Sequence, residues 1–364
     1  MIRVLHMIGS LNIGGSQAMI MNLYRNIDRE QIQFDFIVDH PEQLYFAEEV
    51  ESLGGKIFFM PEFTGINLLS VKKSWNNFFK RHPEYKILHS HVRSYASVYL
   101  PIAKKHGLKT IVHSHSTTNG TGILSAIKKI MQYPLRYQSD YLFGCSQASG
   151  EWLFGKSVVN SNKYYNLKNA VDVEKYKFNP DVREKYRNQL GLENKKTYIH
   201  VGRFHPSKNH IFLLEIFTKL CKKEDAVLLL VGDGGLNSKI KERVNELKLN
   251  DSVLFLGIRD DIPELFQAAD CFVFPSLWEG LPVVAVEAQS AGMPCFISET
   301  ITNEVTLTDL VKKLSITDGV ECWVKAIEEC DLSRRDRVND IKNAGFDIED
   351  TSKWITEFYE SIYN

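Results

Sequence analysis

Two carboxylates, Glu279 and Glu287, lie eight residues apart in a stretch that passes from an apolar strand end through a turn into a helix. The turn contains Pro275 and Gly280. Pro282 suits the first turn of the helix, where its missing N–H has no intrahelical partner to lose. Glu279 is therefore expected in the turn and Glu287 inside the helix. Burying a carboxylate among small apolar residues without a partner is costly. The pair therefore indicates a site that binds hydroxyl groups.

Two cations, Arg203 and Lys208, follow the apolar strand 197–201 and Gly202, ahead of another helix. An arginine offers a fork of donors and a lysine a point charge, and a helix N-terminus adds partial positive charge. This arrangement can neutralise a diphosphate. The alternative is that each cation forms an ordinary surface salt bridge.

Glycines mark two further strand ends, in Gly232-Asp233-Gly234 and at Gly257. The carboxyl edge of a parallel sheet is where such folds bind ligands, and backbone groups there can border a flat base. Cations placed for phosphates and carboxylates placed for hydroxyls together describe a sugar nucleotide.

Near the start of the chain, the turn Gly14-Gly15-Ser16 connects a strand to a helix. Glycine allows close approach of the backbone to a ligand, and the free N–H groups of a helix N-terminus suit an anion. The turn lacks the G-x-G-x-x-G spacing of dinucleotide enzymes, which argues against an oxidoreductase. A tight turn with only a structural role is the alternative.

Two pairs of histidines end neighbouring strands, namely His89 with His91 and His113 with His115. Residues two apart in a strand point to the same side. His115 lies where its strand gives way to a polar loop, whereas a buried structural role suits His113 better.

Short apolar strands alternate with amphipathic helices in both halves of the chain, which indicates two doubly wound parallel sheets in tandem. A polar segment, 169–195, separates the halves. We expect a first domain over residues 1–178, a second over 179–345 and a terminal helix over 346–364 that returns to the first domain. The expected strands are 2–8, 34–38, 56–60, 87–89, 110–113, 141–145, 197–201, 226–231, 253–256, 271–275 and 294–297.

The composition is that of a soluble protein, with 44% hydrophobic and 24% charged residues and no apolar run long enough to span a membrane. The first apolar run is too short for a signal peptide and fits a first strand. Six cysteines without metal-ligand spacing favour a reducing cytoplasm. Residues 1–178 hold 21 Lys+Arg and 14 Asp+Glu, hence +7, and the remainder carries −8. Basic helix faces are either simply solvated or turned toward an anionic membrane.

The combination of Gly202-Arg203 with Lys208, Gly232-Asp233-Gly234, and Glu279 and Glu287 followed by Ala288 and Gly292 resembles the retaining family 4 glycosyltransferases. The similarity is greatest to the branch that builds bacterial exopolysaccharides and capsules. It implies the GT-B fold, with two Rossmann-like domains facing across a cleft. One departure is Gln17, where related enzymes often carry an acidic residue.

The resemblance implies a role for each matching position. Arg203 and Lys208 would hold the donor diphosphate, Glu287 the ribose hydroxyls and Glu279 the transferred sugar. In the first domain, His115 would face the reacting sugar. The remaining expected donor contacts are Gly15, Gly202, Gly232, Asp233, Gly257, Gly280, Leu281, Pro282 and Val283. The expected acceptor contacts are Gly14, Gly15, Ser16, His91 and His113.

The resulting hypothesis is transfer of a hexose from a nucleotide sugar, UDP-linked, to a lipid-linked or saccharide acceptor with retention of anomeric configuration. No Asp-x-Asp motif suggests a metal, so we expect no metal, no cofactor and no nucleic-acid partner. We expect the protein in the cytoplasm or peripherally at the inner face of the membrane. The alternatives are a silent sugar-nucleotide-binding subunit and a GT-B sugar-nucleotide epimerase.

Overall fold

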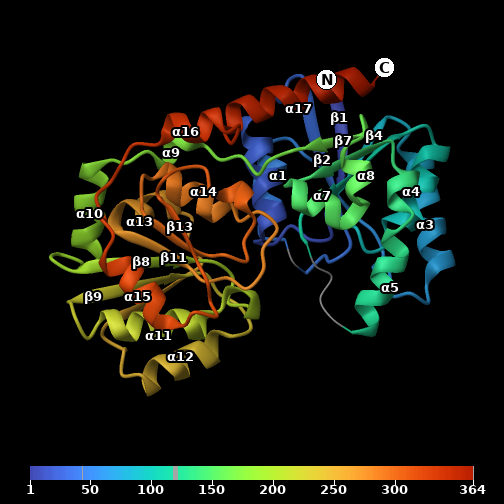
Figure 1. Ribbon diagram of the computed structural model, residues 1–364. Helices are drawn as coiled ribbons and strands as arrows, with labels where there is room; N and C mark the ends of the chain where they lie inside the picture. The colour runs from blue at the N-terminus through green and yellow to red at the C-terminus, as the bar shows by residue number, and fades with distance from the viewer. Residues whose placement is uncertain (43, 118–121, 364) are drawn as a thin grey trace. The chain divides into compact units, whose positions relative to one another are not determined.

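The computed structural model describes residues 1–42, 44–117 and 122–363 (Figure 1). The chain forms two compact units. The first comprises Met1–Ala170 together with Ile348–Asn364, and the second comprises Val171–Asp347. Within the described residues, none of the helices has the length and apolar composition needed to cross a bilayer.

A parallel sheet of seven strands forms the centre of the first unit, as far as the chain is described, in the order β3-β2-β1-β4-β5-β6-β7. Its strands are β1 (Ile2–Met7), β2 (Ile32–Val38), β3 (Ile57–Phe59), β4 (Ile87–Ser90), β5 (Lys109–Ser114), β6 (Tyr141–Gly144) and β7 (Tyr164–Asn166). The helices are α1 (Gly15–Asn26), α2 (Ala47–Ser52), α3 (Leu68–Arg81), α4 (Ala96–Lys105), α5 (Ile123–Gln132), α6 (Leu135–Gln138), α7 (Gln147–Phe154), α8 (Lys156–Val159) and α17 (Ile348–Tyr363).

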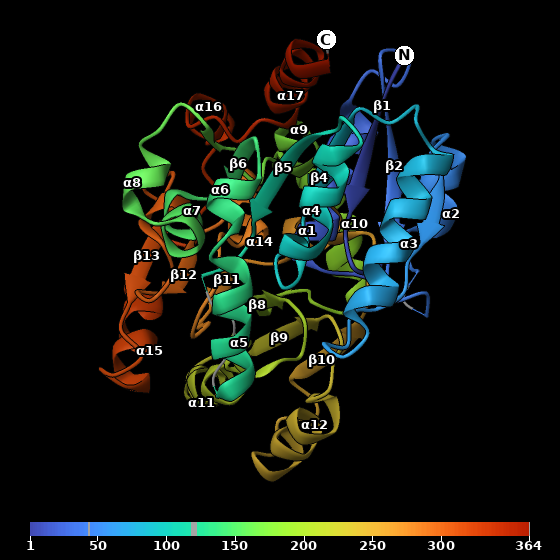
Figure 2. The ribbon, with the colours of Figure 1, turned by 90° about the vertical axis from the view of Figure 1, so that its right-hand side faces the viewer.

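Helices cover both faces of this sheet, because parallel strands joined by crossovers bury both of their sides. One core packs α1 and α17 against the sheet, and it includes Phe34, Phe143 and Tyr359. The other core packs α3, α4 and α7 against the opposite face around Trp75 and Tyr99. Figure 2 shows α3 and α4 beside the strands of this unit.

The second unit repeats the plan with a parallel sheet whose six strands, among the described residues, lie in the order β10-β9-β8-β11-β12-β13. Its strands are β8 (Lys196–Val201), β9 (Ala226–Val231), β10 (Val253–Gly257), β11 (Cys271–Phe274), β12 (Cys295–Ser298) and β13 (Val311–Leu314). Its helices are α9 (Val173–Tyr176), α10 (Pro180–Leu190), α11 (His210–Leu220), α12 (Asn237–Glu246), α13 (Ile262–Ala268), α14 (Val283–Ser290), α15 (Val320–Glu328) and α16 (Val338–Asn343). Short 3₁₀ turns cover Pro206–Lys208 and Asn303–Val305.

One core of the second unit packs α11, α12 and α15 on the sheet around Phe217 and Trp323. Helices α13 and α14 lie on the other side of the strands (Figure 1). Helix α14 has no single apolar stripe, because its apolar residues are not confined to one face. Ala285, Val286 and Ala288 are all buried. A short helix of small residues fits where the surrounding chain approaches from several sides.

The two units meet in sequence at Ala170 and Val171, eight residues before the boundary that we expected after residue 178. The reason is packing. The backbone N–H of Val171 donates to the carbonyl of Phe346 over 2.9 Å, and α9 contacts α13 and α14. The polar composition of 169–195 did not reveal these contacts.

The expected alternation of strands and helices in two parallel sheets is confirmed, with element ends shifted by one to three residues in most cases. The sequence analysis missed two edge strands, β7 and β13. Strand β7 has only three residues. Strand β13 has four, and its Lys312 is exposed. Neither strand therefore has the continuous apolar run of a central strand.

Candidate functional site

Each sheet has one point where the strand order reverses, between β1 and β4 in the first unit and between β8 and β11 in the second. At such a point the connections leave in opposite directions, so the loops beyond the carboxyl ends of the strands open a crevice for ligands. The residues that follow these four strands are therefore the candidates for ligand binding and catalysis.

In the second unit, the loops after β8 and β11 bring Lys208 and Glu279 together. Lys208 Nζ lies 2.6 Å from Glu279 Oε1, and its ammonium lies 4.6 Å from the centre of the Phe274 ring. The backbone N–H of Leu277 donates to the Ser207 carbonyl over 2.7 Å, which links the two loops. Both side chains of the pair are mostly buried, so the pair is a charge-assisted contact of the kind that holds its geometry.

Arg203 follows the same strand but is exposed, and no hydrogen bond or ion pair is found for it within the described residues. The backbone around it is crowded. A Cβ at Gly202 would lie 3.1 Å from Lys208 Cε, and one at Gly232, whose φ is +127°, would lie 2.2 Å from the Gly202 carbonyl oxygen. Glycine at position 232 is therefore a requirement of the close approach between the ends of β8 and β9.

The carboxylate of Asp233 has a local partner in its own turn. Its Oδ1 accepts hydrogen bonds from the backbone N–H of Gly234 and from Asn237 Nδ2, at 2.7 and 2.6 Å. Gly257 lies next to this turn, since the N–H of Gly232 donates to its carbonyl over 2.7 Å. The expected contacts of Asp233 and Gly257 with the donor stay predictions.

Glu287 lies inside α14, as expected, and forms a hydrogen bond with Tyr176 of α9. Burial raises the pKa of the Glu287 carboxyl to about 7, and the Tyr176 hydrogen bond opposes this shift. Sequence reasoning missed Tyr176 because it assigned residue 176 to the first domain. The carboxyl can change its charge near neutral pH.

The segment Gly280-Leu281-Pro282 leads into α14, which begins at Val283. Pro282 is extended at the helix N-cap, and no side chain caps the helix there. The first N–H groups of a helix have no intrahelical acceptor, so this end of α14 can donate to the oxygens of a ligand. Leu281 is buried and anchors the turn.

In the first unit, five imidazoles lie on one face of the sheet. His6 on β1 pairs in register with His89 on β4, and residues two apart share a face, so His91 lies on that side as well. His113 on the neighbouring β5 and His115, one residue beyond the end of that strand, continue the row. The sequence analysis missed His6; its signal was one titratable residue within an apolar strand.

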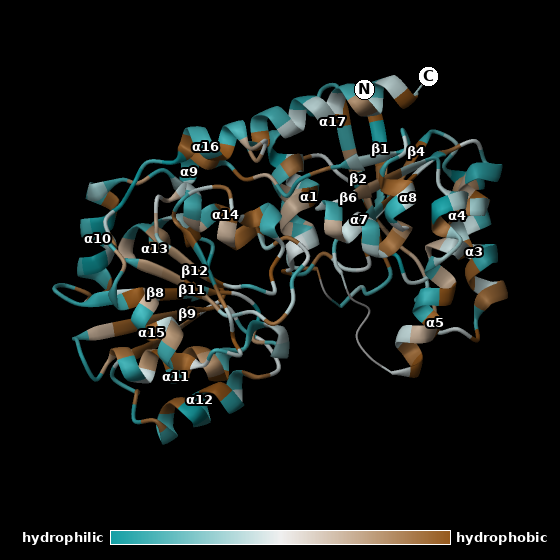
Figure 3. Cartoon of the chain, in the orientation of Figure 1, coloured by the Kyte–Doolittle hydropathy of each residue, from teal (hydrophilic) through white to brown (hydrophobic). Residues whose placement is uncertain are grey.

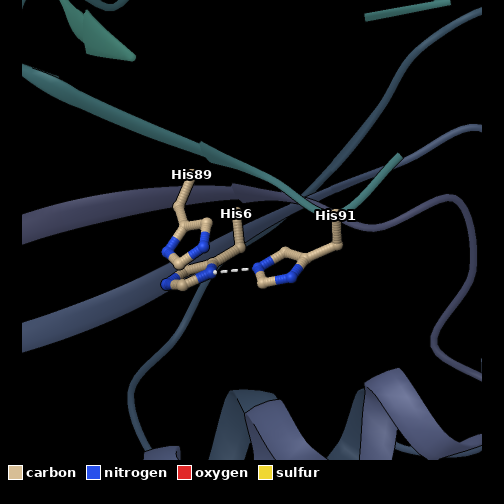
Figure 4. A group of neighbouring side chains, drawn as sticks. All are labelled: His6, His89 and His91. Atoms are coloured by element: carbon tan, nitrogen blue, oxygen red, sulfur yellow. Dashed lines mark hydrogen bonds between the residues drawn. The ribbon is translucent and has the colours of Figure 1, made fainter. Parts of the chain in front are cut away.

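Hydrogen bonds connect three of these rings. His6 Nδ1 lies 3.0 Å from His91 Nε2, and His91 Nδ1 lies 2.8 Å from His115 Nε2. The ring centres of His113 and His115 lie 4.0 Å apart, which agrees with the expectation that both point the same way. Figure 4 shows His6, His89 and His91 turned toward one another.

Burial holds this row of imidazoles in the neutral form. It lowers the pKa of His6 to about 3, and burial together with the nearby Arg93 charge lowers the pKa of His115 to about 3. The pKa values of His89, His91 and His113 are also far below the ordinary value, chiefly because of burial. Sequence reasoning missed Arg93, whose guanidinium lies 5.2 Å from the Trp152 ring centre.

The glycine turn near the N-terminus opens α1, which begins at Gly15. No side chain caps the helix at Gly14, and a Cβ at Gly15 would meet nothing within 4 Å. Open space at Gly15 agrees with a backbone that a ligand approaches. Gln17, the departure noted above, donates from Nε2 to the Ser10 carbonyl over 3.2 Å and accepts from Ser16 Oγ over 2.9 Å.

Two family models match the chain. The one described as "Glycosyltransferase Family 4" covers residues 13–175, and the one described as "Glycosyl transferases group 1" covers residues 182–346. The chain is 34% identical to EpsF of Bacillus subtilis (strain 168), which is named as a glycosyltransferase, over 93% of this chain and 90% of EpsF.

The chain belongs to the family 4 glycosyltransferases. A second family relative is the UDP-Gal:alpha-D-GlcNAc-diphosphoundecaprenol alpha-1,3-galactosyltransferase of Escherichia coli, 29% identical over 79% of this chain and 76% of that protein. The structure of Anabaena HepE in complex with UDP and glucose superimposes with a TM-score of 0.81 at 20% identity, over 99% of this chain and all of HepE. The family 4 membership inferred from the motifs and the expected GT-B fold are thus confirmed.

Proposed function

We propose that this glycosyltransferase moves a hexose from a UDP-sugar to a lipid-linked saccharide acceptor with retention of anomeric configuration, in the assembly of a bacterial exopolysaccharide or capsule. The observation that carries the proposal is the Lys208–Glu279 pair, 2.6 Å apart at the switch point of the second sheet. A diphosphate needs a cation, and a sugar needs an acceptor for its hydroxyls. The pair presents both at one place.

Lys208 would bind the diphosphate of the donor. An ammonium has three N–H donors, and the contact with Glu279 uses one of them. The exposed Arg203 would add its forked donors, and both would stabilise the negative charge that develops on the leaving phosphate. Uridine is supported by two similar proteins, the E. coli relative named for its UDP-Gal donor and HepE, crystallised with UDP and glucose.

Glu279 and Glu287 would position the donor without acting as base or nucleophile. Glu279 is held by Lys208, and Glu287 lies within α14 beside Tyr176. Attack on the same face of the sugar, with the leaving phosphate accepting the acceptor's proton, then requires no carboxylate. This supports retention.

In the first unit, His115 would face the reacting sugar, while His113 behind it would support its ring. His115 is partly exposed just beyond β5, whereas His113 is fully buried. His91 and the Gly14-Gly15-Ser16 turn would contact the acceptor. A lipid-linked acceptor is supported by the diphosphoundecaprenol in the name of the E. coli relative.

Helix α5 would hold the enzyme at an anionic membrane surface from the cytoplasmic side. Four apolar side chains on it are exposed, and two lysines accompany them; the residues are Ile123, Leu124, Ile127, Lys128, Lys129 and Ile130. Figure 3 shows the apolar colour on this helix. Apolar side chains combined with cations are typical of helices that lie in the membrane interface.

The test is incubation of the purified chain with a panel of nucleotide sugars and a diphosphoundecaprenol-linked saccharide, followed by mass analysis of the lipid product and determination of the anomeric configuration by NMR. We expect transfer from a UDP-sugar with the donor's configuration retained. An inverted product would contradict retention.

Two other outcomes would replace the proposal. Donor binding without transfer to any acceptor would indicate a silent subunit that supports a partner transferase. Conversion of the donor's own sugar in the absence of acceptor would indicate an epimerase. Lys208→Ala is the control in each case, because it removes the proposed diphosphate contact.

A further inference from the structure

Several imidazole nitrogens in the first unit are buried without a hydrogen-bond partner within the described residues. They are His6 Nε2, His89 Nε2, His115 Nδ1 and both ring nitrogens of His113. A buried polar atom normally has a partner, and leaving one without a partner costs free energy. A concentration of such atoms in one place therefore suggests a ligand.

Three of the histidines converge on a common point. His6, His89 and His91 each offer one ring nitrogen, and these nitrogens all lie within 4.8 Å of one another (Figure 4). His6 Nδ1 and His91 Nε2 lie 3.0 Å apart. Tetrahedral zinc with Zn–N bonds of about 2.0–2.1 Å separates its ligand nitrogens by roughly 3.3 Å. Small side-chain movements suffice to reach this geometry.

The outer nitrogens of two of these rings are already held. His89 Nδ1 lies 2.7 Å from the hydroxyl oxygen of Tyr359 on α17, and His91 Nδ1 lies 2.8 Å from His115 Nε2. A histidine that binds a metal through one nitrogen almost always uses its other N–H in such a contact, which fixes its tautomer. His89 Nε2 and His91 Nε2 are then left for the ion.

We propose that His6, His89 and His91 bind a zinc ion at the β1–β4 switch point, with a water molecule as the fourth ligand. Neutral imidazoles suit zinc and other late transition metals, whereas magnesium and calcium prefer oxygen. The other possible trio is His91, His113 and His115. It is less suitable because two of its rings, His113 and His115, have a nitrogen without a partner in the described chain, whereas in the first trio only His6 Nε2 is left without an outer partner.

Zinc at this position also determines how His115 presents its proton. With the ion on His91 Nε2, the proton of His91 lies on Nδ1 and is donated to His115 Nε2. His115 then carries its own proton on Nδ1, the nitrogen without a partner in the described residues, and can donate it to an oxygen of a ligand. His91 would then act as a positioning residue for His115 in place of the acceptor contact proposed above, because both of its ring nitrogens are in use. The expectation from the sequence that the chain binds no metal would be corrected for this unit.

The test uses the full chain without a polyhistidine tag. The protein is stripped with a chelator, dialysed and titrated with Co²⁺, and Zn²⁺ is then added in competition. We expect one ion per chain and the intense visible absorption of tetrahedral cobalt. Zinc should also raise the melting temperature of the stripped protein. None of these measurements depends on transfer activity, so they stand apart from the proposed function.

Three variants define the site. His89→Ala removes a ligand and should weaken zinc binding by more than about 100-fold, since loss of an outer partner alone costs about 10- to 100-fold. Tyr359→Phe removes only the outer partner of His89 and should fall in that lower range. His82→Ala, at a partly buried histidine outside the cluster, should change nothing.

The proposal fails if the stripped wild-type protein binds neither Co²⁺ nor Zn²⁺ more tightly than His89→Ala does. It also fails if the cobalt spectrum is octahedral and unchanged by Tyr359→Phe. Either result would show that the row is held by hydrogen bonds between imidazoles alone. Circular dichroism establishes that each variant is folded, and Tyr359→Phe keeps the test decisive if His89→Ala does not fold.

Discussion

The two switch points of this glycosyltransferase occupy the same place in two similar sheets, yet they carry opposite kinds of chemistry. At β8 and β11 the loops hold full charges, with Lys208 paired to Glu279 and Arg203 exposed nearby. At β1 and β4 the side chains are imidazoles, which burial keeps neutral. The topology provides the place for a ligand, and the residue types decide which ligand it is.

The difference in charge matches the difference in proposed task. A nucleotide diphosphate arrives with negative charge and is bound by cations, whereas a sugar hydroxyl is neutral and is bound by a donor or an acceptor. Neutral imidazoles can serve as either and can also bind a transition metal. A lysine would serve poorly in place of these imidazoles, since burying its ammonium without a partner is costly.

The largest expected effect is at the charged switch point. Lys208→Ala should lower kcat/KM by about 100- to 1,000-fold, because it removes a donor aimed at the charge that develops on the leaving phosphate. It should also weaken UDP binding measured by calorimetry. Lys239→Ala, at an exposed lysine of α12, is the matched control and should match wild type. Unchanged UDP affinity in Lys208→Ala would remove this residue from the phosphate site.

At the neutral switch point, His115→Ala should lower kcat about 100-fold, in the range of a lost hydrogen bond or proton-transfer contact at the reacting centre. His113→Ala should cost less than about tenfold, because its ring is buried behind His115. The measurement is single-turnover transfer with both variants folded, as judged by circular dichroism. The reverse order of effects would exchange the roles of the two histidines.

A smaller effect concerns the dependence of UDP binding on pH. The pKa of Glu287 is raised to about 7 by burial, so its carboxyl is mostly protonated at pH 6 and mostly ionised at pH 8. The ionised form accepts stronger, charge-assisted hydrogen bonds from the ribose hydroxyls than the protonated form does. Affinity should therefore rise with pH, by about five- to tenfold over this interval.

Glu287→Gln is the control for that experiment, because it keeps the shape of the side chain and removes its titration. UDP itself titrates near this range. The quantity to compare is therefore the slope of UDP affinity against pH, measured for the variant and for wild type. Parallel slopes would show that the ionisation of Glu287 does not contribute to nucleotide binding.

The smallest effect is expected at the membrane. Replacing Ile123 and Ile127 of α5 by serine should weaken binding to anionic vesicles by about tenfold, because apolar surface that enters the interface is lost. Ile258→Ser, at an exposed apolar residue of the second unit, is the control. Equal sedimentation of the α5 variant and wild type with anionic vesicles would exclude this helix as the contact.

Much of the second switch point was predictable from the sequence because its motifs are local. Gly202, Arg203 and Lys208 follow one strand within a few residues, and Glu279 follows another at the start of a helix. Strand and helix periodicity is a short-range property, so the two sheets and most element boundaries were predictable as well.

The remainder depended on contacts between segments that are distant in the chain. The residues near Lys208 in the sequence do not predict Glu279 as its partner. Those near Glu287 do not predict Tyr176. His6 lies 85 residues from His91, and His89 lies 270 residues from Tyr359. These pairs exist because parallel strands place their carboxyl ends at one edge and because α17 packs on the first sheet.

By itself, the sequence determined that this chain is a two-sheet glycosyltransferase with charged residues at the strand ends where we propose that a nucleotide sugar binds, since strand ends, glycines and charges recur at spacings that local geometry dictates. Only the tertiary structure decided which charges are paired, that residues 171–178 belong to the second unit, and that five imidazoles form one largely buried row. Those outcomes depend on the order of strands in a sheet, which periodicity along the chain does not encode.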